Sequence, residues 1–245
     1  MNNKDKILNF IDIFIYLILA ILLAYRGIKS NENLITKIML YILSIIFLII
    51  AIFVYKQKLS YKEALHALND ELNIEKACGL YEKVLKYDFF KVYTRQRSFF
   101  DLMVMLELGE MQKVKWIVEM NNELFDSNAD MQMIKYYYLM RADLALGNND
   151  EVISSYNELS KLLNKGNLSP FFKKEQIEAI KAVAQKRYSD AYNLLKEIDL
   201  NELSLKDKKW VLTNLSNYGT GNNKKIYKQE LEELLRKQED KNVYD

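Results

Sequence analysis

The chain has 245 residues and a formal charge of +2 at pH 7, from 35 Lys and Arg against 33 Asp and Glu. Residues 56–245 contain 30 basic and 30 acidic side chains, so this part of the chain creates no long-range positive field. That balance argues against a general binder of nucleic acid or other polyanions. The single cysteine, Cys78, excludes an intramolecular disulfide.

Two apolar runs near the N-terminus predict membrane-spanning helices. The first, residues 7–25, is interrupted only by Asn9 and Asp12, and the second, residues 38–55, contains no charged residue. A helix of either length spans about 27–28 Å, which is close to the hydrocarbon thickness of a bilayer. We therefore expect a two-helix transmembrane anchor over residues 1–57.

Two other interpretations of these runs stay open. One is a pair of buried core helices in a soluble protein, although basic flanks on both runs are more typical of membrane spans. The other is a cleaved signal peptide over the first run, although no small-x-small cleavage site lies well before Arg26.

Basic residues flank the two sides of the expected hairpin unequally. Five lie on the side that carries both ends of the hairpin, and three lie in or beside the short connection. The first set is Lys4, Lys6, Lys56, Lys58 and Lys62, and the second is Arg26, Lys29 and Lys37. Because the more basic side stays in the cytoplasm, we expect a multi-pass protein of the cell membrane with both termini and the C-terminal domain cytoplasmic.

A recurring turn divides the rest of the chain into units. Each copy is a polar turn, two charged or polar residues, and an apolar residue that opens a new helix. The first residues of successive copies are 37, 38, 39 and 35 positions apart. Three of the five copies open on glycine, the residue that most easily adopts the left-handed conformation closing a helix. The copies begin at Leu72, Gly109, Gly147, Lys186 and Gly221.

Apolar residues at helical spacing on both sides of each turn predict antiparallel helix pairs. Start signals support these pairs: Ser60 with Glu63 forms a capping box, Ser204 with Asp207 forms an acidic variant, and Ser169 precedes a proline at a first helical position. The five expected pairs cover residues 60–86, 92–124, 129–164, 170–199 and 204–238.

This pattern resembles the tetratricopeptide repeat family from residue 60 to about residue 238. The resemblance is carried by Leu-Gly-Glu at 108–110 and Leu-Gly-Asn at 146–148, each at the end of a first helix, and by residues 75–85, which are similar to a second helix of the family. The units are longer than the family's repeat of about 34 residues. Asp101 also stands where an apolar residue is usual.

The resemblance implies an all-α fold in which the transmembrane hairpin is followed by an α-solenoid. We expect helices at about 7–25 and 38–55 in the hairpin, about five tetratricopeptide-like helix pairs in residues 58–238, and a polar tail at 239–245. A generic α-solenoid or an irregular helical bundle is the alternative architecture.

The sequence contains no catalytic signature, and we expect neither an enzyme nor a bound cofactor or metal. His66 is the only histidine, and Cys78 has no second thiol or second histidine with which to form a zinc site. No glycine-rich phosphate loop or dinucleotide fingerprint is present.

In the family, first helices commonly line a concave surface that binds an extended peptide or a partner helix. Counting back from each turn to the family's inward positions gives seven candidate partner-binding residues. They are Gln96, Phe99, Met103, Tyr137, Arg141, Lys173 and Gln176. Tyr137 and Arg141 are the best single candidates, because Tyr and Arg are favoured at interaction hot spots. Packing between repeats is the alternative role for each of the seven.

These features favour a membrane-tethered cytoplasmic adaptor or scaffold that binds a protein or peptide partner and no nucleic acid. The alternative is a regulatory or sensory subunit of a membrane protein complex that packs through its transmembrane hairpin. Small residues, which favour close helix association in membranes, are sparse in the two runs. They are Ala20, Ala24, Ser44 and Ala51. The abundance of Asn, Lys and Ile is typical of an AT-rich bacterial genome.

Overall fold

The computed structural model describes residues 3–29, 33–88, 91–164 and 172–244, and all regular secondary structure in these ranges is helical. The expected all-α fold is therefore confirmed. The chain divides into two compact units. The first unit contains residues 1–64 and 78–90, and the second unit contains residues 65–77 and 91–245.

In the first unit, α1 (Asn3–Lys29) and α2 (Leu34–Asn69) contact each other through small residues. The Ser44 hydroxyl donates a hydrogen bond of 2.7 Å to the carbonyl oxygen of Ala20. Ala20 is buried, as is Ala51 on α2. Ser44 and Ala20 thus lie at the contact between these helices, where small side chains allow the backbones to approach closely.

The helix α2 is long and apolar enough to cross a membrane, and it is the one such helix among the residues that the structure describes. Its most apolar 18-residue stretch is almost entirely exposed. Exposed apolar surface on this scale is typical of contact with lipid or with another protein. The side chains of residues 7–13, which open the first expected span, lie outside the described part. From Phe14 onward, α1 also exposes large apolar side chains, among them Phe14, Ile21, Leu22 and Ile28.

The expected break between the second span and the first repeat helix is wrong. The structure has one uninterrupted helix from Leu34 to Asn69, so Ser60 lies inside a helix and does not cap one. No glycine or proline occurs between residues 55 and 69 to end the helix, and a serine in a helix interior is tolerated. The helix α3 (Ile74–Lys86) contacts α2: Gln57 Nε2 donates a hydrogen bond of 3.1 Å to the carbonyl oxygen of Val84.

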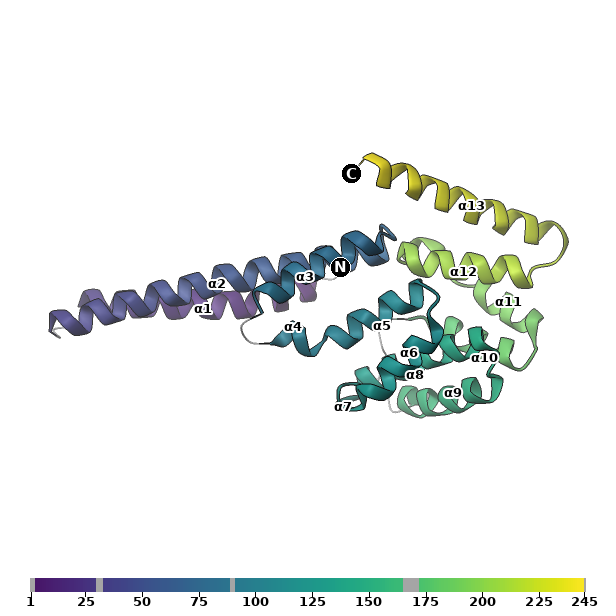
Figure 1. Ribbon diagram of the computed structural model, residues 1–245, viewed down its shortest axis with the longest axis horizontal. Helices are drawn as coiled ribbons and strands as arrows, with labels where there is room; N and C mark the ends of the chain where they lie inside the picture. Colours follow the sequence, from purple (N-terminus) through teal and green to yellow (C-terminus); the bar gives the residue numbers. More distant parts are fainter. Residues whose placement is uncertain (1–2, 30–32, 89–90, 165–171, 245) are drawn as a thin grey trace. The chain divides into compact units, whose positions relative to one another are not determined.

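The second unit is built mainly from helix pairs joined by short turns (Figure 1). The members of each pair pack against each other, and each pair packs against the next along the chain. The paired helices are α5 (Arg97–Glu107) with α6 (Met111–Met120), α8 (Ala129–Leu146) with α9 (Asn149–Asn164), α10 (Lys174–Ala184) with α11 (Tyr188–Lys196), and α12 (Leu205–Tyr218) with α13 (Gly221–Tyr244). Short helices α4 (Val92–Arg95), α7 (Asn122–Phe125) and η1 (Leu200–Glu202) lie between them.

All five predicted turns contain a left-handed residue at their first position. The φ angles are 75° at Gly109, 78° at Gly147 and 56° at Gly221, and they are also positive at Leu72 (52°) and Lys186 (60°), where glycine is absent. In three turns the next residue donates its N–H to the carbonyl five positions back, which is the hydrogen bond that closes a Schellman motif. These bonds join Glu110 to Met105, Asn148 to Asp143 and Arg187 to Ala182.

The apolar residue that follows each turn is a core position in four of the five units. Ala77, Val114, Val152 and Ala191 are each 0% exposed. In the fifth unit the equivalent residue, Ile226, is 42% exposed. The α13 helix therefore lacks the buried stripe of the earlier second helices.

Three predicted boundaries differ from the structure. The first helix of the second pair is divided at Gln96 into α4 and α5, where the chain leaves helical geometry for one residue. The helix α10 begins at Lys174, and Ser169 with its proline lies outside the described residues. The expected polar tail at 239–245 is helical through Tyr244, since its charged residues have good helix propensity.

Candidate partner-binding cavity

Helices α5, α8 and α12, the end of α2 and the segment before α10 line a cavity of about 250 Å³. We call it the inner cavity. The helix α12 reaches α5, 102 residues earlier in the chain, where Lys209 Nζ lies 3.4 Å from Glu107 Oε2. Helix α12, which opens the last helix pair, therefore contacts α5, which belongs to the earliest pair of the second unit. The inner cavity is lined by Asn69, Phe99, Met103, Ile134, Tyr137, Tyr138, Arg141, Phe172, Ser204, Lys206 and Asp207.

The helix α8 supplies the centre of the wall. Its N-terminus is fixed by Asn128, whose side chain accepts a 2.9 Å hydrogen bond from the N–H of Met131. Ile134, Tyr137, Tyr138 and Arg141 then follow at spacings of three and four residues, which place them on one side of the helix. The helix α8 also packs against α9, α6 and α10, which hold it in place.

Tyr137 is buried and held by aromatic stacking. Its ring lies 4.3 Å from that of Phe172, centroid to centroid, with an interplanar angle of 16°. Its hydroxyl is buried with no hydrogen-bond partner among the described residues. Burial raises the pKa of this phenol well above its ordinary value, although the nearby Arg141 charge acts in the opposite direction. Tyr137 is therefore neutral at physiological pH and offers an unused O–H donor.

Arg141 is positioned between two aromatic rings. Its Cζ lies 5.9 Å from the centre of the Tyr137 ring and 5.1 Å from that of Trp210, within the range of cation–π attraction. Its Nε is buried without a hydrogen-bond partner among the described residues. Arg141 and the Tyr137 hydroxyl are close enough to interact electrostatically, but they do not share a hydrogen bond of acceptable geometry.

The start of α12 adds a buried lysine to the wall of the inner cavity. As predicted, Ser204 caps this helix: its Oγ accepts a 3.2 Å hydrogen bond from the N–H of Asp207 and donates one of 2.7 Å to the Asp207 carboxylate. Between them, Lys206 is only 6% exposed. Burial lowers the pKa of the Lys206 ammonium, and the neighbouring Asp207 carboxylate partly offsets that effect.

Four of the seven predicted partner-binding residues meet at the inner cavity. Phe99 and Met103 lie one turn apart on α5, and Tyr137 and Arg141 lie one turn apart on α8. Whether any of them binds a partner stays a prediction. Their convergence follows from the spacing rule, because residues four apart share one face of a helix.

The other three predicted residues do not line the inner cavity. Gln96 lies at the junction of α4 and α5. Gln176 is 1% exposed, and its Oε1 accepts a 2.9 Å hydrogen bond from the N–H of Lys173, so it caps α10. The Lys173 ammonium pairs with Glu202 at 2.6 Å in solvent, and this hydrogen bond raises its pKa.

No protein-family model, curated protein or solved structure matches this chain. The function must therefore be argued from the inner cavity itself. The residues of its wall that were not predicted are Asn69, Ile134, Tyr138, Phe172, Ser204, Lys206 and Asp207. Lys206 lies 15 residues before its turn, outside the register of the predicted positions, so the helical spacing gives no signal for it.

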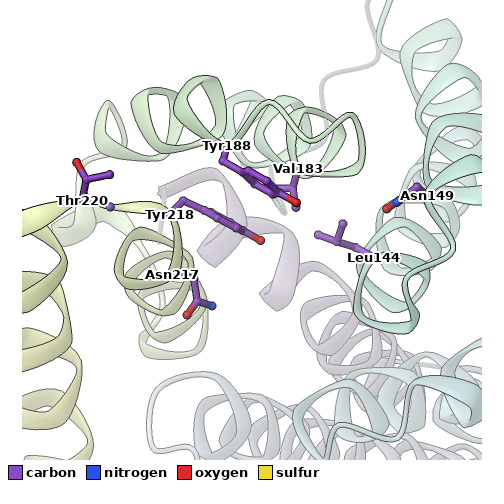
Figure 2. Close-up of a pocket in the computed structure, with 8 residues that line it drawn as sticks. Leu144, Asn149, Val183, Tyr188, Asn217, Tyr218 and Thr220 are labelled. Carbon is purple, nitrogen blue, oxygen red and sulfur yellow. The ribbon is translucent and has the colours of Figure 1, made fainter.

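A second, more open cavity of about 580 Å³ lies among the turns (Figure 2). The rings of Tyr188 and Tyr218 stack beside it, 5.4 Å apart, and Asn149 and Asn217 supply its polar side chains. None of its lining residues is charged.

The described residues hold no group of three or more His, Cys, Asp and Glu side chains that could bind a metal ion. His66 lies on the surface near the end of α2, with Nδ1 2.9 Å from Asp70 Oδ2. This is a solvent-exposed contact between a ring nitrogen and a carboxylate, which contributes little to stability.

Proposed function

We propose that the chain is a membrane-tethered adaptor whose second unit binds a protein or peptide partner at the inner cavity. The observation that carries the proposal is the composition of the wall: aromatic rings, a methionine and two cations surround buried polar atoms with no partner in the described chain. Aromatic and arginine side chains dominate protein-binding hot spots. Buried polar groups without partners are costly in a wall that serves packing alone.

The tether in this proposal is a two-span hairpin of α1 and α2 over residues 1–57. Its support is the length and apolarity of α2, the hydrogen bond from Ser44 to Ala20, and the burial of Ala20. The excess of basic residues on the side of the termini favours a cytoplasmic second unit. Anchoring would confine the partner to a thin layer at the membrane and raise its effective concentration.

The binding unit in this proposal is a tetratricopeptide-like α-solenoid. Its support is the recurrence of helix pairs, the left-handed residue in each turn, and the buried position after four of the turns. Lys209 on α12 reaches Glu107 on α5, and the first helices line a small cavity where the resemblance implies an open concave surface. The partner would therefore bind by inserting side chains into this small cavity, and a partner with a flat surface would not fill it.

The first experiment tests the tether. Full-length protein should sediment with membranes and resist carbonate at high pH, while a chain that begins at Lys58 should remain in the supernatant and be helical by circular dichroism. The exposed apolar side chains of α2 are the physical reason, because only the full-length chain carries them. Release of the full-length chain by carbonate would rule out the tether.

The same two chains separate an adaptor from a subunit that packs through its hairpin. In mild detergent, a partner of the adaptor should co-purify with both chains, whereas a complex held by transmembrane helices should be lost with the hairpin. In intact cells the second unit should resist added protease, since the proposal places it in the cytoplasm. Digestion in intact cells would reverse the orientation.

A further inference from the structure

The charges around the inner cavity do not balance. Arg141 and Lys206 are cations of the wall, and Asp207 is its one carboxylate. The nearby Glu107 is already paired with Lys209, outside the wall. Neither Arg141 nor Lys206 lies within 4.0 Å of a carboxylate among the described residues, and the lining side chains carry one more positive than negative charge. Asp70, a further anion near Lys206, lies 2.9 Å from His66.

The donors of the wall are also unused. The Nε–H of Arg141 and the hydroxyl of Tyr137 are buried and have no acceptor among the described residues. Lys206 is only 6% exposed. The Asp207 carboxylate accepts from Ser204 at the helix cap and from neither of these two buried donors. Two buried donors therefore lack an acceptor, and the Lys206 ammonium in the same wall has no ion-pair partner among the described residues. One negatively charged acceptor would suit all three.

The rest of the wall is apolar. Phe99 and Met103 from α5, Ile134 from α8, and Phe172 before α10 lie around the same space. A carboxylate that fits here must reach the donors on an apolar stem. The methylene stem of an acidic side chain meets that need, whereas a chain's C-terminal carboxylate sits directly on peptide backbone.

We propose that the inner cavity binds an acidic side chain of a partner's peptide segment, with its carboxylate held by Arg141, Lys206 and Tyr137 and its stem against Phe99 and Met103. This inference rests on the proposed function, since it names the chemistry of the partner at the same cavity. A single carboxylate neutralises the unpaired charge and satisfies the unused donors in one step. Binding should accordingly weaken as the salt concentration rises, though less steeply than for exposed ion pairs.

Trp210 gives a reporter for this binding, because its ring contacts Arg141. The chain has 2 tryptophans, and the other, Trp116, is 59% exposed, so Trp116→Phe in the full chain leaves a single signal. In detergent, the probe is acetyl-Ala-Leu-Glu-Leu-Ala-amide. We expect a saturable change in Trp210 fluorescence, binding weaker by about tenfold or more for the same peptide with Gln in place of Glu, and a similar loss in Arg141→Met and Lys206→Met.

Circular dichroism controls for folding of both variants, and Lys224→Met, at an exposed site of α13, should bind as the parent does. Equal affinity for the Glu and Gln peptides would overturn the inference and leave the adaptor proposal standing. Tighter binding of a Gln peptide with a free C-terminal carboxylate would overturn the choice of an acidic side chain. Failure of the adaptor proposal has a different signature: no partner would be captured from the inner cavity in native membranes.

Discussion

Replacing Ala191 by glutamate should lower the free energy of unfolding by about 3 kcal/mol or more. Ala191 is 0% exposed and packs in a cluster with Leu195 on its own helix, with Ala182 on α10 and with Val211 and Leu215 on α12. A larger side chain there overpacks the contact between helix pairs, and its carboxylate has no buried partner. Urea denaturation of the full chain in detergent, followed by circular dichroism, measures the loss.

The matched control is the same change at Lys224. This residue lies early in α13 and is exposed, so Lys224→Glu should alter the free energy of unfolding by no more than about 0.5 kcal/mol. Equal losses for the two variants would contradict a packed array of helix pairs, because the array buries one site and leaves the other in solvent.

The second large effect has the opposite sign. Lys206→Met should raise the free energy of unfolding by roughly 1–2 kcal/mol at neutral pH, because it replaces a buried, unpaired ammonium with an apolar side chain of similar length. Most substitutions destabilise a protein. A gain in stability together with a loss of binding would indicate that Lys206 is retained for its ligand. Unchanged or reduced stability would show that the ammonium is better accommodated than its burial implies.

The advantage of Lys206→Met should shrink at high pH. Burial lowers the pKa of Lys206 in the folded chain below its ordinary value of 10.5, so the unfolded chain binds more protons between these two values. In that window the stability of the parent chain rises with pH relative to the variant. The charges that face this ammonium are Asp207, Arg141, Glu107 and Asp70. Unfolding free energies of both chains at neutral pH and at about pH 10 measure the trend.

The sequence predicted the turns because their signals are local. Gly109, Gly147 and Gly221 mark three of them, and the polar pattern around Leu72 and Lys186 marks the other two even without glycine. A left-handed residue is required wherever a helix reverses within a few residues, so the geometry recurs although the residue type does not.

The length of α2 was not predictable from local signals, because two of them conflict. Ser60 with Glu63 has the spacing of a capping box, but no helix-breaking residue precedes it. The energy of a cap is about 1 kcal/mol. Continuing an existing helix avoids a second nucleation and costs less than starting a new one.

Four of the eleven residues that line the inner cavity were predicted. Phe99, Met103, Tyr137 and Arg141 follow from helical spacing, but the approach of α12 to α5 depends on a small rotation added at each helix pair. Single residues do not encode the total rotation over several helix pairs. The sequence therefore did not predict that Lys206 lines the same cavity as Arg141. Gln176 shows the converse: a polar side chain at an inward position serves as a helix cap.

Photocrosslinking from the wall of the inner cavity in native membranes tests the central claim most directly. A photoreactive phenylalanine analogue in place of Phe99, in the full-length chain, lies in the wall of the cavity. The same analogue in place of Trp116 lies on the exposed surface of α6 and is the control. Adaptor function predicts one discrete protein adduct from Phe99 and none from Trp116. The same adducts from both positions, or none from Phe99 in membranes that hold the native protein, would contradict it.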